Sequence, residues 1–246
     1  MTRPILGPEP IVTGIERRLF LRQTLSLGAL ALLTGCDISD QQGVQAVLKA
    51  MSRWNDRAQA FLFRHQVLAP TFAESDVARN FRYNAYFPVA DVPKLAAADY
   101  RLELSGLIAD KRPWSVARIY SLPQQSQITR HVCVEGWSVI GKWSGPRLSD
   151  FLHRVGADLT AKYLGYQCAD GYYGSIDMAT ALHPQTIMAV KFADATLPAK
   201  FGYPFKLRIP TKLGFKNPKW VTTMYVTNRM PGGFWEDRGY NWFSGS

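Results

Sequence analysis

The sequence of 246 residues is poor in the residues and spacings that mark common metal, haem and nucleotide sites. It holds three cysteines and four histidines. It has no Cys-x-x-Cys pair, no His-Glu-x-x-His run and no Cys-x-x-Cys-His run, which disfavours structural zinc, zinc-protease chemistry and covalent haem. It also has neither a Gly-x-Gly-x-x-Gly turn nor a Gly-x-Ser-x-Gly elbow. Three cysteines are also too few for a disulfide framework.

Long hydrophobic runs are missing as well. The longest apolar segment, residues 24–35, is about half of the ~20 residues that cross a bilayer. It follows Arg17 and Arg18, so we interpret the N-terminus as a twin-arginine export signal; a short buried helix is the alternative. Leu33-Thr34-Gly35-Cys36 resembles a lipobox, which predicts lipidation of Cys36, with simple cleavage or an uncleaved anchor as alternatives. Residues 1–36 are therefore expected to be a targeting signal that is not part of the folded domain.

Positive charge is in excess, but it is dispersed. There are 29 Lys and Arg residues against 19 Asp and Glu, a formal net charge of +10. Neither an arginine-rich helix nor an aromatic RNA-binding motif accompanies this charge, so no nucleic acid partner is expected. An anionic lipid surface or an anionic cofactor is the more natural counterpart. With 47% apolar residues, the chain can fill one sizeable core.

The pattern of apolar residues predicts one mixed α+β domain at 79–246, preceded by a helical spacer or flap at 37–78. Apolar residues at helical spacing predict a helix over 41–63 and shorter helices over 148–155 and 177–182. Residues 69–93 are expected to be an ordered loop. Strands are predicted over 100–104, 128–134, 162–168, 187–192, 205–209 and 220–227.

Cys133 is the residue with the strongest chemical signal, because a protein that folds before export can carry a metal loaded beforehand. A disulfide with Cys168 is one alternative. A cysteine nucleophile served by His131 is another, but side chains two apart on a strand lie about 6–7 Å apart, too far for direct proton transfer. The remaining interpretation is a thiolate that binds a soft, high-valent metal held mainly by an organic ligand.

The motifs around and after Cys133 resemble those of the sulfite oxidase family of molybdopterin-binding oxidoreductases, particularly its small twin-arginine-exported members such as catalytic subunits of protein-methionine-sulfoxide reductase. The resemblance covers roughly residue 80 to the C-terminus. Its motifs are the Cys-Val-Glu-x-Trp-Ser run with the following Trp-x-Gly, the turn at 170–175, and residues 183–186, 202–208, 212–220 and 232–240. The resemblance implies a mixed-sheet molybdopterin-binding domain, here expected without the C-terminal dimerisation domain.

The same resemblance implies a cofactor, Mo-molybdopterin with one pterin per molybdenum, and assigns residues to it. Cys133 matches the cysteine that ligates molybdenum. Positive charge for the pterin phosphate is expected from Lys206, Arg208, Lys216 and Lys219, and both Asn217 and Lys219 match pterin-contacting positions. Two residues depart from the family pattern: Lys206 replaces the usual arginine and Phe201 replaces a polar residue.

Further site residues follow from the resemblance. Asn84 matches an early cofactor-facing asparagine, with Asn80 as the alternative, and Cys168 lies where relatives have a small polar residue near the cofactor. Tyr173 matches the active-site tyrosine, whose phenol can hydrogen-bond an oxyanion. His131 and Glu135 are expected to orient Cys133. His183 is expected to be a structural or pterin-side hydrogen-bonding residue.

The function implied is two-electron oxygen-atom transfer by a periplasmic enzyme, lipid-anchored to the cytoplasmic membrane. A monomeric catalytic subunit is expected to take electrons from a membrane b-type or a c-type cytochrome and to reduce an S- or N-oxide. Three alternatives stay open: sulfite-type oxidation, a non-catalytic pterin-binding module, and a metal-free cysteine hydrolase.

Overall fold

The structure is a computed structural model that describes residues 42–62, 67–85 and 87–246. The predicted export signal and Cys36 lie outside the described residues. The chain divides into two compact units, residues 1–53 and 54–246. None of the described helices combines the length and the hydropathy needed to cross a bilayer.

The described part of the chain begins with helix α2, Gln42–Leu62, which confirms the helix predicted over 41–63. The loop predicted over 69–93 contains only short 3-10 turns among its described residues, Glu74–Asp76 (η1) and Val89–Asp91 (η2). A bridge pairs Thr71 with Thr129, and the Phe72 amide donates to the Ile128 carbonyl, so this loop is tied to the strand that leads to Cys133.

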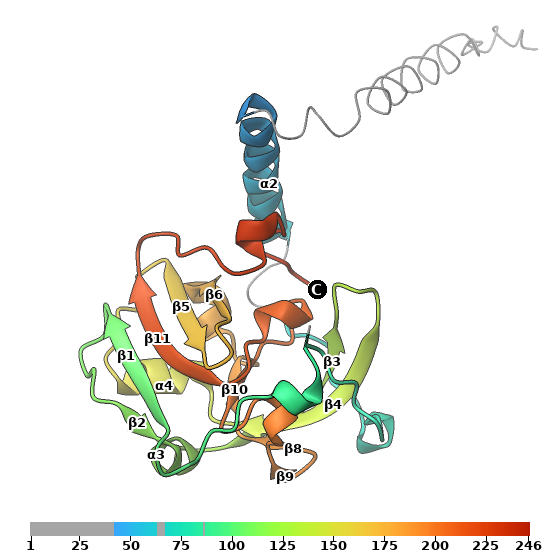
Figure 1. Cartoon of the computed structure of the whole chain (residues 1–246), viewed down its shortest axis with the longest axis vertical. Coiled ribbons are helices and arrows are strands. Elements are labelled where there is room, and N and C mark those ends of the chain that lie inside the picture. The colour runs from blue at the N-terminus through green and yellow to red at the C-terminus, as the bar shows by residue number, and fades with distance from the viewer. Residues whose placement is uncertain (1–41, 63–66, 86) are drawn as a thin grey trace, which may run out of the picture. The chain divides into compact units, whose positions relative to one another are not determined.

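A five-stranded mixed sheet forms one half of the domain, with strand order β2-β1-β11-β5-β6 (Figure 1). Strand β1 pairs parallel to β11, and the other pairings are antiparallel. Its strands are β1 (Arg101–Gly106), β2 (Trp114–Ser115), β5 (Tyr163–Cys168), β6 (Tyr173–Asp177) and β11 (Val221–Thr227). Together with the sheets below, this arrangement confirms the predicted mixed-sheet α+β fold.

Helices α3 (Val116–Tyr120), α4 (Leu148–Arg154) and α5 (Met178–Leu182) pack on the main core. Asp177 begins α5 as its N-cap, because its carboxylate accepts from the Thr180 amide at 2.7 Å. The core itself is built from alternating strand residues such as Leu102, Leu104, Leu164, Tyr166 and Met224, all buried.

A second sheet carries the turn that holds Cys133. Its order is β3-β4-β8-β9, from Gln125–Val132, Ser138–Gly145, Lys191–Phe192 and Ala195–Thr196. Strand β3 ends at Val132, so Cys133 lies in the turn after the strand rather than within the strand predicted over 128–134. A short sheet pairs β10 (Lys206–Arg208) with β7 (Ile187–Ala189). The strand predicted over 187–192 is therefore two strands in different sheets.

Candidate active site at the Cys133 turn

The Cys133 turn joins β3 to β4 and lies in a pocket. The Cys133 amide donates to the Trp137 carbonyl at 2.9 Å, and the Gly136 amide donates to the Cys133 carbonyl at 3.1 Å. Gly136 has φ of 86°, a conformation that glycine adopts without a steric penalty. The turn therefore fixes the backbone on both sides of a half-buried thiol.

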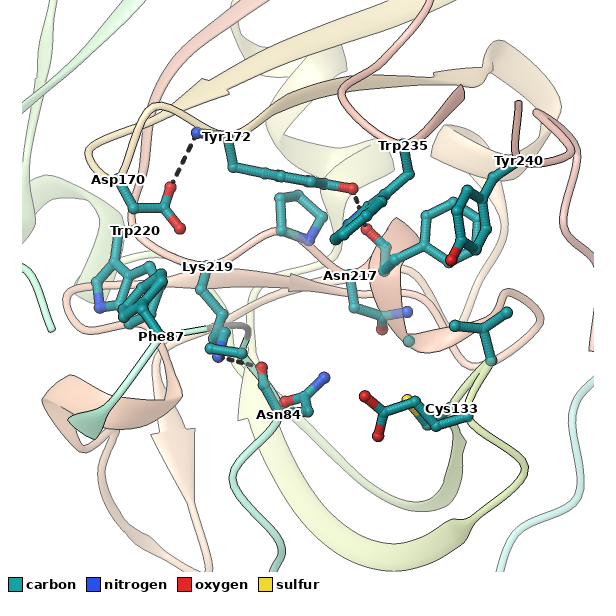
Figure 2. Close-up of a pocket in the computed structure, with 16 residues that line it drawn as sticks. Asn84, Phe87, Cys133, Asp170, Tyr172, Asn217, Lys219, Trp220, Trp235 and Tyr240 are labelled. Carbon is teal, nitrogen blue, oxygen red and sulfur yellow. Dashed lines mark hydrogen bonds between the residues drawn. The ribbon is translucent and has the colours of Figure 1, made fainter. Parts of the chain in front are cut away.

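The pocket is built from five segments far apart in the sequence. The pocket, counted together with the solvent space at its open mouth, has a volume of about 940 Å³. Figure 2 shows Cys133 and Asn84 along one side of the pocket and Tyr172 and Trp235 along the other. The segments are Asn84, Ala85 and Phe87, the turn 133–135, the β5–β6 turn at 170–172, the loop 214–220, and the C-terminal residues Trp235 and Tyr240.

The environment of the Cys133 sulfur balances opposing effects. Burial raises the pKa of the thiol, and the backbone amides of Glu135 and Val134 lower it by hydrogen bonding; the Glu135 carboxylate raises it and Arg82 lowers it. The Glu135 carboxylate in turn accepts from Trp137 Nε1 at 2.7 Å. Both Cys133 and Cys168 are free thiols, so the alternative of a disulfide between them is wrong.

His131 and Asn84 support the floor of the pocket beside Cys133. Their side chains meet at 3.2 Å, between Asn84 Nδ2 and His131 Nε2. Burial lowers the pKa of His131 far below its usual value, and the cations Arg208, Lys206 and Lys219 lower it further. A Cβ at Gly214 would come within 2.7 Å of His131 Nε2, so a glycine is required for this packing.

Lys219 is the cation that lines the pocket. Its ammonium donates to the Asn84 carbonyl at 2.7 Å and lies 4.6 Å from the centre of the Tyr83 ring. Burial lowers the pKa of Lys219 to about 8, although Asp170 partly opposes this effect. Asn84 and Lys219 were predicted to face the cofactor, and both line the pocket.

Asn217 also lines the pocket and organises the basic residues behind it. Its Oδ1 accepts from Arg208 Nη1 at 2.9 Å and from the Ile209 amide at 2.7 Å, and its Nδ2 donates to the Leu213 carbonyl at 3.1 Å. Arg208 also donates to the Thr129 hydroxyl and the Arg130 carbonyl, while its Nε has no hydrogen-bond partner among the residues that the structure describes. Asn217 therefore joins β10 to the loop that forms one pocket wall.

Lys206 is 2% exposed and lies 4.9 Å from the centre of the Trp143 ring. Burial lowers the pKa of Lys206, and the neighbouring cations Lys219 and Arg208 lower it further. Among the described residues no carboxylate forms an ion pair with it. Gly202, with φ of 116°, allows this crowding, because a Cβ there would lie 3.0 Å from the Lys219 Cβ and 3.1 Å from the Lys206 Cβ.

Lys216 and Tyr173 are placed differently from the other predicted residues. Lys216 is buried in an ion pair with Glu236, behind the pocket wall. The Tyr173 hydroxyl donates to Asp237 at 2.7 Å, and Tyr173 does not line the pocket. Its neighbour Tyr172 does, and donates its own hydroxyl to the Phe215 carbonyl at 2.7 Å. Side chains of successive residues in extended backbone point to opposite faces. Tyr172 therefore faces the pocket, whereas its neighbour Tyr173 faces Asp237.

Cys168 and Phe201 are both buried away from the pocket lining. Cys168 ends β5, and burial raises the pKa of its thiol well above the usual range. Phe201, which replaces a polar residue in the family pattern, packs among Phe81, Trp143 and Phe192. Its aromatic side chain is therefore explained by the core cluster that supports β4.

Trp220 closes one edge of the pocket in a strained conformation. Its φ of 52° is uncommon for a large side chain. The fully buried indole donates to the Ala199 carbonyl at 2.7 Å, which holds the residue in place. The pocket residues Trp220, Tyr172 and Trp235 were not predicted from the sequence. The type of an aromatic residue alone does not show whether its side chain lines a pocket or packs in the core.

The residues present fit an anionic cofactor that brings its own metal ligands. Lys206 and Arg208 are buried beside the half-buried Lys219, and buried charges are costly without anionic partners. Within residues 42–62, 67–85 and 87–246 no group of three or more His, Cys, Asp or Glu side chains could hold a metal. Cys133 is thus suited to add one sulfur ligand to a metal held by an organic anion.

Comparison with known proteins gives the same assignment. The model of the oxidoreductase molybdopterin-binding domain matches residues 89–235. Over 230 residues the chain is 55% identical to the putative protein-methionine-sulfoxide reductase subunit YedZ1 of Azospira oryzae, covering 94% of this chain and 88% of that protein. It is 28% identical to the mitochondrial sulfite oxidase of Drosophila melanogaster, covering 92% of this chain and 46% of that protein.

A solved structure shares the fold. The sulfane dehydrogenase SoxCD from Paracoccus pantotrophus superposes with a TM-score of 0.53 at 20% sequence identity, covering 56% of this chain and 40% of that one. At this identity the likeness concerns the fold alone.

Proposed function

Because this chain belongs to the sulfite oxidase family of molybdopterin-binding oxidoreductases, we propose that it is the catalytic subunit of an enzyme that reduces an S-oxide by two-electron oxygen-atom transfer. The observation that carries the proposal is the position of Cys133, half-buried in a pocket that is backed by Lys206 and Arg208, with which no described carboxylate forms an ion pair. The similarity to a methionine-sulfoxide reductase subunit supports the choice of substrate class.

The chain's own residues have separate roles in this proposal. When bound, the molybdenum cofactor would supply a two-electron redox centre able to exchange an oxygen atom. Cys133 would provide a thiolate ligand, and Lys219 with Asn217 and Asn84 would hold the pterin by charge and hydrogen bonds. Lys206 and Arg208 would add positive potential from behind the wall.

The aromatic side of the pocket suits a neutral substrate. Phe87, Phe215, Trp220, Trp235 and Tyr240 line it with apolar surface. Such walls exclude water and favour the carbon groups of a thioether oxide over a small dianion such as sulfite. Polarisation of the substrate oxygen by Tyr173, predicted from the family pattern, stays a prediction.

An assay of both directions tests this function. Protein loaded with cofactor should oxidise a reduced dye when given peptide-bound or free methionine sulfoxide, and Cys133→Ala should lose this activity. Failure with every S- and N-oxide, together with sulfite-dependent reduction of an electron acceptor, would assign the sulfite-type reaction instead. A folded, cofactor-loaded protein inactive in both directions would support the non-catalytic alternative.

We further propose that the enzyme is exported by the twin-arginine route, is anchored through Cys36 and receives electrons from a membrane b-type or a c-type cytochrome. Residues 16–36 support this proposal by their twin arginines, apolar segment and lipobox-like end. Cell fractionation is the test: the protein should be found with the membrane in a form that labels with palmitate, and Cys36→Ser should abolish the label.

A further inference from the structure

Helix α2 displays large apolar side chains on one face. Trp54 is 70% exposed, Phe61 84% and Met51 63%, and Val47, Leu48 and Leu62 are also exposed. At 100° per residue, the large apolar residues from Val44 to Leu62 occupy one side of the helix. An apolar stripe of this kind is usually buried against another surface.

The other side of the same helix is basic. Lys49, Arg53 and Arg57 follow one another at intervals of four residues, which places them together opposite the apolar stripe. Asp56 is the one acidic residue of the helix, and its carboxylate is occupied by hydrogen bonds from Asn241 Nδ2 at 2.6 Å and the Phe243 amide at 2.8 Å. The contact through Asp56 leaves the side chains of Trp54 and Phe61 exposed.

We propose that α2 is a membrane-surface helix that lies in the plane of an anionic bilayer, with Met51, Trp54 and Phe61 inserted among the acyl chains. Three cations against one anion complement an anionic headgroup layer. The same excess of positive charge disfavours a coiled coil between two copies, which pairs charges of both signs across its seam. Tryptophan and phenylalanine are side chains suited to the boundary between headgroups and acyl chains.

This inference does not depend on the molybdenum site or on lipidation of Cys36. It adds a second membrane contact to the lipid proposed for Cys36. A helix in the interface would hold the enzyme at the surface where a membrane-bound electron donor is found.

Fluorescence quenching at Trp54 provides a test that other membrane contacts do not disturb. The experiment uses the full chain with Cys36→Ser, which carries no lipid, and phosphatidylglycerol vesicles with brominated acyl chains. The signal is the quenched emission that disappears in the matching Trp54→Phe protein, about one-seventh of the total if the seven tryptophans emit equally. We expect this signal with phosphatidylglycerol and at least a tenfold weaker affinity with phosphatidylcholine. No Trp54-dependent quenching would overturn the proposal.

Two variants of equal charge separate insertion of the apolar face from attraction of the basic face. Met51→Glu places the new carboxylate in the apolar stripe, and Ala46→Glu places it on the exposed opposite side. Met51→Glu should weaken vesicle binding, read from the Trp54-dependent quenching, at least tenfold more than Ala46→Glu. Equal effects would contradict insertion. Dimerisation in the absence of vesicles that Met51→Glu abolishes would assign the face to a second copy instead.

Discussion

Lys206 is the residue whose environment is most clearly suited to an anion. Its ammonium is buried beside Trp143, and its nearest charged neighbours, Lys219 and Arg208, are also positive. A protein gains nothing in stability from such an arrangement, since each buried cation lowers the free energy of unfolding unless an anion compensates it. We therefore infer that Lys206, Arg208 and Lys219 lower the stability of the cofactor-free protein and serve to bind an anionic cofactor.

Replacement of Lys206 by methionine should separate these two roles. In protein made by a host without molybdopterin, Lys206→Met should raise the free energy of unfolding by about 1–4 kcal/mol, because it removes an uncompensated buried charge. In a cofactor-producing host the same variant should retain less molybdenum. Urea unfolding and elemental analysis are the measurements, with Lys206→Arg as the control that keeps the charge. A cofactor-free Lys206→Met protein less stable than the parent would show that the charge is compensated.

Tyr172 and Tyr173 form a second pair of residues whose roles can be separated. Tyr172 lines the pocket and holds the Phe215 carbonyl, whereas Tyr173 binds Asp237 outside the lining. Tyr172→Phe should therefore lower kcat/KM for the S-oxide about three- to tenfold, the effect of one hydrogen bond of ~1 kcal/mol. Tyr173→Phe should change it less. The reverse order would support the role that the family pattern predicts for Tyr173.

At the scale of elements, a buried ion pair connects two segments of the pocket wall. Lys216 belongs to the 3-10 turn Gly214–Lys216 (η4), and Glu236 begins the turn Glu236–Arg238 (η5) next to Trp235. Their side chains are 1% and 6% exposed, so each charge depends on the other. Lys216 was predicted to be one of the cofactor cations, and in the structure its charge is paired with Glu236.

Removal of one member of this pair should be more harmful than removal of both. Glu236→Leu leaves a buried ammonium without its carboxylate and should lower the free energy of unfolding by about 3–5 kcal/mol. The double variant Lys216→Met with Glu236→Leu should recover most of the loss. A double-mutant cycle by urea unfolding measures the coupling free energy between the two side chains. If the effects of the two single variants simply add up in the double variant, the two side chains are not coupled and the account of this ion pair is wrong.

Elements with clear periodicity were predictable, and those with close backbone contacts were not. Helix α2, α4 and the strands β1, β5 and β11 follow their apolar patterns. Strand β4 was missed because it contains glycines that the fold requires: a Cβ at Gly145 would lie 2.0 Å from the Met188 carbonyl oxygen, and one at Gly141 2.7 Å from Phe81. Such contacts are tertiary and leave no period in the sequence.

The candidate site, too, was predictable from the sequence only in part. Cys133, Asn84, Asn217 and Lys219 could be named from motifs, and the structure brings all four to one pocket. Lys206 and Arg208 were predicted as cofactor cations, which stays a prediction, and their burial behind the wall depends on β10 pairing with β7. The aromatic walls come from separate loops, and their convergence on the pocket is determined by the whole fold.

At the scale of the whole molecule, the buried lysines predict how stability changes with pH. Burial lowers the pKa of Lys212 to about 7 and that of Lys219 to about 8, against an ordinary value near 10.4 in the unfolded chain. Between pH 7 and about 8.5 the unfolded chain then binds more protons, so the free energy of unfolding should rise with pH, by at most ~1.4 kcal/mol per pH unit for each proton.

Urea unfolding of the cofactor-free protein at pH 7.0 and 8.0 measures this rise, because below the ordinary cysteine pKa of about 8.5 most thiols of the unfolded chain still hold their protons. Lys212→Met should reduce it, because the variant removes the group with the lower of the two pKa values. A free energy of unfolding that falls over this range would contradict the protonation states described for Lys212 and Lys219.

The central claim, that Cys133 is the protein's ligand to molybdenum, is tested most directly by X-ray absorption at the molybdenum edge. Protein from a molybdenum-replete host should contain about one molybdenum per chain, and Cys133→Ala should show one sulfur ligand fewer around the metal. Cys168→Ala, which removes the other free thiol of the described chain, should leave the sulfur count unchanged. An equal count in Cys133→Ala and its parent, or a folded parent protein without molybdenum, would contradict the account.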